Sequence, residues 1–232
     1  MGQNDMADIQ VDEDLVMKSQ MEKMVPSYDA YMKKMTFGRE RTLRETTVSL
    51  ADVKTGDCVL EIGCGTGTLT LAAKRRAGPS GKVFGIDIIP GMIELSTQKA
   101  AKLGEEVSFQ LGSIDDIPFP PNQFNVVLCS FMIFHMSEMT RSKGIQEIYR
   151  VLKPKGRLLV VDLALPSQPI PRAIAQMLFG FMLDHDVKEL LPLMEAGGFS
   201  EVEIAPVKFR ILGLSVLAYI RGCAKKVELK SH

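Results

Sequence analysis

Short runs of β-branched and other apolar residues alternate with helical patterns along the chain from about residue 57 onward. The runs typical of strands lie at residues 58–62, 83–87, 107–111, 125–130 and 157–163. Helical periodicity between them predicts helices at residues 68–77, 92–103 and 143–151, the last stopped by Pro154 and Gly156. This alternation predicts a mainly parallel sheet covered by helices on both faces.

The pattern changes in the last part of the chain. Residues 187–196 favour a helix that ends at two glycines, and two β-like runs follow, at residues 202–210 and 215–223, with only a short connection between them. Such a pair predicts an antiparallel hairpin at the edge of the sheet. The predicted fold is therefore α/β: a doubly wound, mainly parallel seven-stranded sheet, Rossmann-like, with an antiparallel C-terminal hairpin.

The segments outside the strand and helix alternation suggest how the chain is divided. With 232 residues, it has room for one α/β domain and some added helices. Residues 1–52, helical with a break at Pro26, are predicted to form a cap over a pocket, and residues 53–232 the core. Within the core, residues 165–186 begin with several prolines, continue as an apolar helix and are predicted to be a lid insertion.

Composition excludes several classes of partner. Lys plus Arg and Asp plus Glu are both 28, so no strong field points to nucleic acid, and the acidic residues 5–14 and basic residues 225–230 are expected to be solvated. The most apolar stretches, residues 174–183 and 211–220, are shorter than the roughly 20 residues that span a bilayer, so we expect a soluble protein without stable membrane insertion. The apolar helix at residues 173–183 could touch a membrane surface, but it lacks the Lys and Arg expected on a polar face.

The four cysteines, Cys58, Cys64, Cys129 and Cys223, are scattered along the chain without any C-x-x-C pair. This spacing predicts neither a zinc site nor a disulfide framework. A reducing, cytoplasmic setting and no bound metal are therefore expected.

The strongest chemical signal is a turn with three alternate glycines. The apolar run that begins at Val59 leads through Gly63, Gly65 and Gly67 into a predicted helix. Glycine accepts positive φ and allows a ligand to approach the backbone, so the turn can hold a cofactor against the start of that helix. A tight strand-to-helix connection without a ligand is the plainer alternative.

An acid at the end of the next predicted strand narrows the choice of ligand. Asp87 can accept hydrogen bonds from both hydroxyls of a ribose, although a lone Asp there can also simply cap a helix. Nicotinamide enzymes use the fingerprint G-x-G-x-x-G, whereas here the third glycine comes one residue earlier, and Glu61 adds an acid that would repel a diphosphate. Both features favour a cofactor without phosphate that carries an amino group and a sulfonium.

These residues, with four further motifs in the same order, resemble the class I S-adenosylmethionine-dependent methyltransferases, and within them the ubiquinone/menaquinone C-methyltransferase-like family. The resemblance covers residues 28–165. Its motifs are residues 59–67, 85–92, 112–119, 124–127 and 148–157.

The resemblance implies a role for each matching residue. The methionine part of S-adenosylmethionine would lie over Gly63, Cys64, Gly65 and Gly67, with Glu61 near its amino end, and Asp87 would hold the ribose. The remaining cofactor-binding residues that it implies are Ile88, Met92, Ser113 and Ile114 around the adenine, Ser130 at the ammonium, and Tyr28 on the closing helix. Ile88 and Ile114 could equally be core residues.

The chain departs from the family at several positions. Ser113 replaces an Asp that usually pairs with the adenine, so Asp115 or Asp116 would have to compensate; Asn125 replaces another Asp, and Lys155 a Gly. Phe134 and His135 stand where the quinone enzymes carry an Arg-Asn pair, so quinone C-methylation is only one of several possible activities.

The predicted function is transfer of a methyl group from S-adenosylmethionine, leaving S-adenosylhomocysteine, to a small acceptor. His135 is the candidate general base, because it follows the fourth strand at the rim expected to face the acceptor; it could also only cap or pack. The chain has 14 methionines, gathered in segments expected to cover the pocket. They favour a hydrophobic or aromatic acceptor, although ordinary packing of helices against the sheet explains them nearly as well. A non-catalytic module that binds the cofactor and a nicotinamide-dependent oxidoreductase remain as alternatives.

Overall fold

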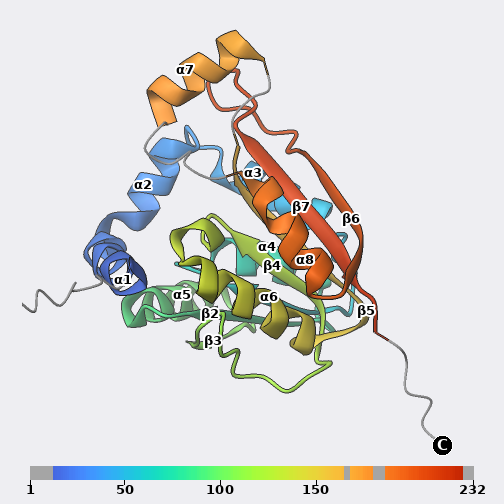
Figure 1. Cartoon of the computed structure of the whole chain (residues 1–232). Coiled ribbons are helices and arrows are strands. Elements are labelled where there is room, and N and C mark those ends of the chain that lie inside the picture. The colour runs from blue at the N-terminus through green and yellow to red at the C-terminus, as the bar shows by residue number, and fades with distance from the viewer. Residues whose placement is uncertain (1–12, 165–167, 180–185, 227–232) are drawn as a thin grey trace, which may run out of the picture.

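A computed structural model describes residues 13–164, 168–179 and 186–226. Its seven-stranded sheet has the order β3-β2-β1-β4-β5-β7-β6, in which only β7 runs against its neighbours (Figure 1). The strands are β1 (Cys58–Ile62), β2 (Lys82–Asp87), β3 (Ser108–Leu111), β4 (Phe124–Ser130), β5 (Leu152–Leu163), β6 (Phe199–Pro206) and β7 (Leu217–Ala224). The predicted doubly wound sheet with its antiparallel C-terminal hairpin is confirmed.

Helices cover both faces of this sheet. The helices between and after the strands are α4 (Thr68–Ala77), α5 (Pro90–Leu103), α6 (Glu138–Val151), α7 (Pro169–Phe179) and α8 (Leu190–Ala196). Alternate residues of β1 point to opposite faces, and both faces are buried: Val59 belongs to an apolar cluster with Leu43 and Leu69, and Leu60 to a second with Ile145 and Leu190. The core therefore has two layers, one on each side of the sheet.

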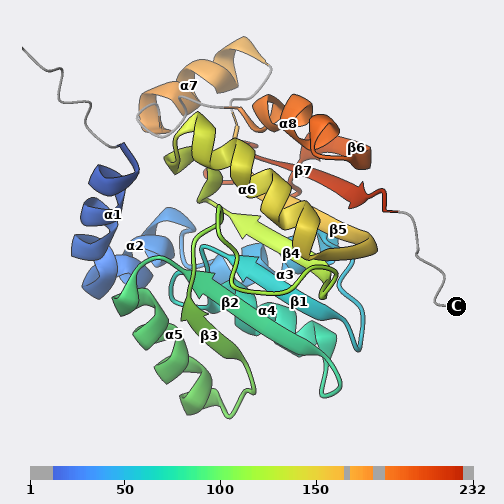
Figure 2. The same cartoon turned by 60° about the horizontal axis from the view of Figure 1, so that its bottom comes forward.

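Three N-terminal helices precede the sheet. They are α1 (Glu13–Met24), α2 (Tyr28–Met35) and α3 (Glu40–Leu50), and the 3₁₀ turn Val25–Ser27 that separates α1 from α2 contains Pro26. Figure 2 shows α1 and α2 at the side of the sheet where α5 begins, set apart from α8 and β6. The acidic stretch was predicted to be solvated, and this is wrong for Asp14, which is partly buried and hydrogen-bonded to the start of α6. Residues 5–12 lie outside the described part of the chain.

Several element boundaries differ from the sequence prediction. Helix α6 begins at Glu138 rather than at residue 143, because the Ser137 hydroxyl caps it by accepting a hydrogen bond from the Thr140 amide at 3.3 Å. Strand β5 begins at Leu152 rather than at residue 157, and Lys155, where the family has Gly, takes a φ of 61° there. The predicted helix at residues 187–196 is a 3₁₀ turn, Val187–Glu189, followed by α8.

The C-terminal basic stretch was also predicted to be solvated. Instead, the Lys226 ammonium donates hydrogen bonds to the Asn122 side chain and to the carbonyl oxygens of Arg150 and Leu152. Residues 227–230, like residues 165–167 and 180–185 of the predicted lid insertion, lie outside the described ranges. Within those ranges, the chain has no helix of the length and apolarity needed to cross a membrane.

Candidate functional site

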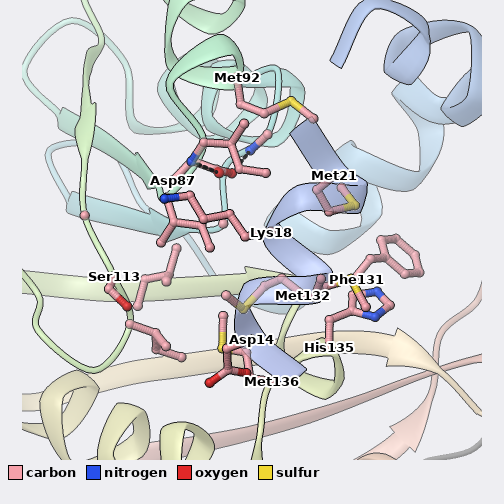
Figure 3. Close-up of a pocket in the computed structure, with 18 of the residues that line it drawn as sticks. Asp14, Lys18, Met21, Asp87, Met92, Ser113, Phe131, Met132, His135 and Met136 are labelled. Atoms are coloured by element: carbon pink, nitrogen blue, oxygen red, sulfur yellow. Dashed lines mark hydrogen bonds between the residues drawn. The ribbon is translucent and has the colours of Figure 1, made fainter. Parts of the chain in front are cut away.

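A cavity of about 290 Å³ lies at the carboxyl ends of β1, β2 and β4, and α1 contributes to its wall (Figure 3). Ligands of doubly wound sheets bind at this edge. Most of the residues predicted from the sequence line the cavity: Tyr28, Gly63, Gly65, Asp87, Ile88, Met92, Ser113, Ile114, Ser130 and His135. Glu61, Cys64 and Gly67 are not among the residues that line it.

The glycine turn shapes the floor of the cavity. Gly63 and Gly67 have left-handed backbone, with φ of 65° and 78°. A Cβ atom on Gly63 would lie 2.8 Å from Cγ of Met132, so there is no room for a side chain next to the cavity. A Cβ atom on Gly67 would lie 2.8 Å from Cζ of Phe109, on β3, so close packing leaves no room for a side chain at this glycine.

Asp87 joins the glycine turn to the end of β2. Its Oδ2 accepts a hydrogen bond from the Gly65 amide at 2.9 Å, and its Oδ1 accepts one from the Ile89 amide at 3.0 Å (Figure 3). Each carboxylate oxygen can accept a further hydrogen bond, for example from a ligand hydroxyl. Burial raises the pKa of Asp87, although the hydrogen bonds from backbone amides partly oppose this effect.

Glu61 and Cys64 lie behind the cavity wall. The Glu61 carboxylate accepts a hydrogen bond from the Thr70 hydroxyl on α4, and burial raises its pKa to about 8. The Cys64 amide donates to the carbonyl oxygen of Ile86 at 2.9 Å, and burial raises the pKa of its thiol well above the usual range. Glu61 is therefore mostly protonated at neutral pH, and a nearby cation would favour its charged form, while Cys64 ties the turn to β2.

Helix α2 attaches directly to the glycine turn. Tyr28 packs over Gly65, where an added Cβ atom would lie 3.4 Å from Cε1 of the ring, and burial raises the pKa of Tyr28 to about 12. The next residue, Asp29, accepts hydrogen bonds from the Thr66 hydroxyl at 2.6 Å and from the Lys99 ammonium at 2.9 Å. The phenol of Tyr28 is therefore neutral at physiological pH and fixed in the cavity wall.

A buried arginine that no sequence pattern indicated supports the cavity wall at Ser130. Arg44 of α3 donates to the Ser130 hydroxyl at 3.2 Å, to the Thr68 hydroxyl at 3.1 Å and to the Glu40 carboxylate at 3.2 Å. Ser130 lines the cavity, so Arg44 holds one of its walls from behind. The only local signal was the Glu40 and Arg44 pair four residues apart, which also occurs on many exposed helix faces.

Ser113 and its neighbours form the wall that faces Ile88 and Met92. The Ser113 hydroxyl donates to Oδ1 of Asp115, which also lines the cavity and forms an ion pair with Lys143 at 3.5 Å. The hydrogen bond from Ser113 holds the pKa of Asp115 below its usual value. Two acids could compensate for the Asp that the family has in place of Ser113. Asp115 lines the cavity, whereas Asp116 is exposed outside it. Ile114 is both a core residue and part of the wall.

Helix α1, part of the segment expected to cover the pocket, forms the part of the cavity wall that faces the sheet. Met17, Lys18 and Met21 line the cavity, and Figure 3 shows the Lys18 side chain extending from α1 toward Asp87. Asp14 fixes the helix by accepting hydrogen bonds from the Ser137 amide at 2.8 Å and the Thr140 hydroxyl at 2.6 Å. Burial raises the pKa of Asp14, but these bonds outweigh burial and leave it lowered.

His135 ends the 3₁₀ turn η2 (Ile133–His135) that follows β4. It is exposed at the cavity rim, and Figure 3 shows it on the opposite side of Met132 from Ser113. An imidazole in this position can reach a molecule that enters the cavity from solvent.

The donor set suits a nucleoside with a cationic end. Asp87 stands at the end of β2 with hydrogen-bond capacity left, and Gly63 leaves no space for a side chain beside it. A sulfonium or ammonium would stabilise the charged forms of the Glu61 and Asp87 carboxyl groups, whereas a diphosphate would oppose their ionisation. The residues present therefore fit S-adenosylmethionine. Among the described residues, no group of three or more His, Cys, Asp or Glu side chains is arranged to hold a metal.

Comparison with known families agrees with this site. The methyltransferase domain family matches residues 59–156, from β1 into β5. The demethylmenaquinone methyltransferase of Symbiobacterium thermophilum is 34% identical over 176 residues, which are 75% of this chain and 66% of that protein. The ubiquinone/menaquinone biosynthesis C-methyltransferase UbiE of Escherichia fergusonii is 34% identical over 149 residues, 63% of this chain and 59% of that protein. This chain thus spans less than two thirds of the length of these curated relatives.

Solved structures show the same fold. A crystal structure of an S-adenosylmethionine-dependent methyltransferase from Aquifex aeolicus superposes with a TM-score of 0.66 at 22% identity, covering 88% of this chain and 98% of that one. At this identity the similarity concerns the fold alone.

Proposed function

Because this chain belongs to the S-adenosylmethionine-dependent methyltransferases similar to the ubiquinone/menaquinone C-methyltransferases, we propose that it transfers a methyl group from S-adenosylmethionine to a small hydrophobic or aromatic acceptor. One observation carries the proposal most directly. The glycine turn and Asp87 are hydrogen-bonded to each other at the cavity, through the Gly65 amide and Oδ2 of Asp87. A carboxylate held in this way can accept ribose hydroxyls without first reorganising.

Different cavity residues are proposed to contact different parts of the cofactor. When bound, S-adenosylmethionine supplies an electrophilic methyl group on a sulfonium. In the proposal, Ile88 and Met92 pack on one side of the adenine and Ser113 and Ile114 meet its edge. The methionine end lies by Gly63, Gly65, Ser130 and Tyr28, while Glu61, from behind the turn, favours a nearby positive charge.

The acceptor class follows from the rest of the cavity lining. Met17, Met21, Phe131, Met132 and Met136 contribute flexible or aromatic apolar surface. Such a lining excludes water and adapts to an apolar molecule, which supports a hydrophobic or aromatic acceptor. Holding donor and acceptor in line, about 3–3.5 Å apart, can lower the barrier by roughly 7–11 kcal/mol.

His135 is the proposed general base for an acceptor with an O–H or N–H group. A positioned imidazole contributes roughly 10²–10⁴ in rate, less than positioning does, so the enzyme would keep some activity without it. We expect His135→Ala to lower turnover about 10²-fold while the affinity for S-adenosylhomocysteine stays the same, measured by methyl-transfer rates and calorimetry. Unchanged turnover would remove His135 from the chemistry.

The experiment that tests the proposed function compares three ligands and then a set of acceptors. Calorimetric titration of the full chain should show binding of S-adenosylmethionine and S-adenosylhomocysteine but not of a nicotinamide dinucleotide. Methyl release is then measured with phenols, amines, thiols and quinols. Binding of the dinucleotide alone would overturn the proposal, and donor binding without turnover on any acceptor would point to a non-catalytic module.

The setting and organisation are part of the proposal. The free thiols of Cys58, Cys64, Cys129 and Cys223 support a reducing, cytoplasmic compartment. The balanced charge supports a small-molecule acceptor rather than nucleic acid. Residues 1–52 are proposed to act as the cap over the pocket, residues 53–232 as the core, and residues 165–186 as a lid insertion.

A further inference from the structure

Helix α7 exposes a continuous apolar stripe. Ile170, Ile174 and Met177 are 74%, 40% and 78% exposed, and their spacing of four and three residues places them on one side of the helix. The opposite side is buried at Ala175. An exposed apolar stripe of this kind marks a surface that binds a partner.

Two further exposed apolar side chains lie on segments next to α7. Phe37 is 57% exposed in the turn between α2 and α3, and Leu212 is 60% exposed in the connection between β6 and β7. Both have left-handed backbone, with φ of 52° and 50°. Turns of this shape hold a bulky side chain away from the core at a cost in backbone energy.

Contacts between these segments place them side by side. Pro171 of α7 and Arg210 of the β6–β7 connection line the same pocket. The Arg39 guanidinium, beside Phe37, lies 4.8 Å from the centre of the Phe209 ring and donates to the Arg210 carbonyl oxygen at 3.3 Å. Figure 1 shows α7, this connection and the end of α2 at one end of the molecule. We call residues 33–41, 169–179 and 207–214 the docking face.

The docking face is strongly basic although the whole chain is neutral. Its only acid, Glu40, is hydrogen-bonded to Arg44 and Thr68. Its cations are Lys33, Lys34, Arg39, Arg41, Arg172, Lys208 and Arg210. Arg41 forms an ion pair with Glu45 at 2.7 Å. Helix α7 itself supplies only Arg172, and the neighbouring segments supply the other cations.

We propose that the docking face binds reversibly to the surface of an anionic phospholipid bilayer, with the α7 stripe, Phe37 and Leu212 entering the interface. Apolar side chains surrounded by Lys and Arg are the combination that binds anionic interfaces, since burial of apolar surface and attraction to headgroups add. The docking itself does not depend on the methyl-transfer proposal.

Charge decides between a bilayer and a second copy of the chain. Two copies meeting through this face would bring their cations together, which like-charge repulsion disfavours. Anionic headgroups complement the same cations.

Vesicle flotation tests the proposal on the full chain. We expect binding to vesicles of phosphatidylcholine with phosphatidylglycerol, weak binding to phosphatidylcholine alone, and release at high salt. Lys34→Gln and Arg210→Gln should each lower the partition coefficient about five-fold. The double variant Ile170→Ser with Met177→Ser should lower it more than ten-fold. The matched controls are Lys102→Gln and Leu103→Ser, an exposed pair on α5, which should bind like the parent.

A fluorescence measurement checks which side of the protein meets the bilayer. The chain contains no tryptophan, so Met177→Trp introduces a single tryptophan, and Leu103→Trp provides its control. Emission from position 177 should shift to the blue with phosphatidylglycerol vesicles, and emission from position 103 should not. Absence of vesicle binding, equal loss in the α5 controls, or dimers without vesicles that the Ile170 and Met177 variants abolish would each overturn the proposal.

Discussion

Three carboxyl groups are buried near the carboxyl ends of parallel strands: Glu61 of β1, Asp87 of β2 and Asp162 of β5. Burial raises the pKa of all three, to about 8 for Glu61 and about 7 for Asp162. Carboxyl groups that resist ionisation gain from a nearby cation, because it stabilises their charged form. At Glu61 and Asp87, close to the cavity, this favours a cationic ligand.

Asp87→Asn tests this at the residue with the most direct predicted contact. The variant keeps an acceptor for one backbone amide but loses the charge that strengthens bonds to ribose hydroxyls. We expect about 10- to 100-fold weaker binding of S-adenosylhomocysteine by calorimetry, since a hydrogen bond to a charged group contributes roughly 1.5–3 kcal/mol. Asp116→Asn, at an exposed position outside the cavity, is the control. Equal affinity in both variants would show that Asp87 does not hold the ribose.

Asp162 allows a prediction about pH and stability. Its Oδ1 accepts a hydrogen bond from the Leu163 amide at 2.8 Å, while Oδ2 has no partner within the described ranges. Burial raises the pKa of Asp162 to about 7, so the folded state binds a proton at this carboxyl group more tightly than the unfolded chain does. The free energy of unfolding therefore falls as pH rises from about 4 to about 7. The contribution is up to about 4 kcal/mol.

Asp162→Asn should remove this part of the pH dependence. The amide oxygen can still accept the Leu163 bond, and the side chain no longer ionises. The free energy of unfolding, measured with urea at pH 5 and pH 8, should differ less between the two pH values in the variant than in the parent. Glu61 contributes the same pH dependence to both proteins. Parallel pH profiles would contradict the assignment.

At the scale of elements, the cap helices and the core helices are attached differently. Helices α1 and α2 contact the rest of the molecule through the hydrogen bonds of Asp14 and Asp29 and through two packed side chains of α2, Tyr28 and Met32. Helix α4 instead packs close to α5 and β3 at Gly67, beside Phe109 and Ser96. Elements with few buried apolar contacts open at lower cost, so we expect the cap to open before the core.

Gly67→Ala tests how closely these core elements are packed, and Gly38→Ala is its matched control. Both glycines have similar φ, 78° and 74°, but an added Cβ atom meets Phe109 at Gly67 and nothing within 4 Å at Gly38. The left-handed backbone alone costs roughly 1–2 kcal/mol, and overpacking adds roughly 1–3 kcal/mol. Urea denaturation should therefore show a larger loss of stability for Gly67→Ala. Equal losses would mean that the packing adjusts without cost.

At the scale of the whole molecule, two surfaces differ in their charge. The cavity has the buried carboxyl group of Asp87 in its wall and that of Glu61 behind it, and the docking face carries a cluster of cations. The net charge of the chain is zero although its acidic and basic groups gather in different places. This separation of charge would allow a cationic cofactor and an anionic surface to bind at different places on the chain.

Cofactor binding should stabilise the whole fold. A ligand at 100 times its Kd that binds only the folded state adds about 2.7 kcal/mol, which for a chain of this size raises Tm by roughly 5–10 °C. We expect this shift in calorimetric melting with S-adenosylhomocysteine, a much smaller one for Asp87→Asn at the same ligand concentration, and none with a nicotinamide dinucleotide. A shift with the dinucleotide alone would favour an oxidoreductase.

Much of the fold and the centre of the site follow from sequence patterns alone. The order of strands and helices, the glycine turn and Asp87 are visible because each depends on residues close in sequence, where spacing reports local backbone geometry. Boundaries were less accurate where a side chain decided them, as Ser137 does at α6.

The contacts that complete the site required the tertiary structure. Asp14 meets Ser137 across 123 positions, and Arg44 meets Ser130 across 86. Residues 33–41 and 207–214, which carry cations of the docking face, also meet only in the folded chain, where Arg39 donates to the Arg210 carbonyl oxygen across 171 positions. No periodicity encodes such pairs, because they depend on how packed elements bring distant segments of the chain together.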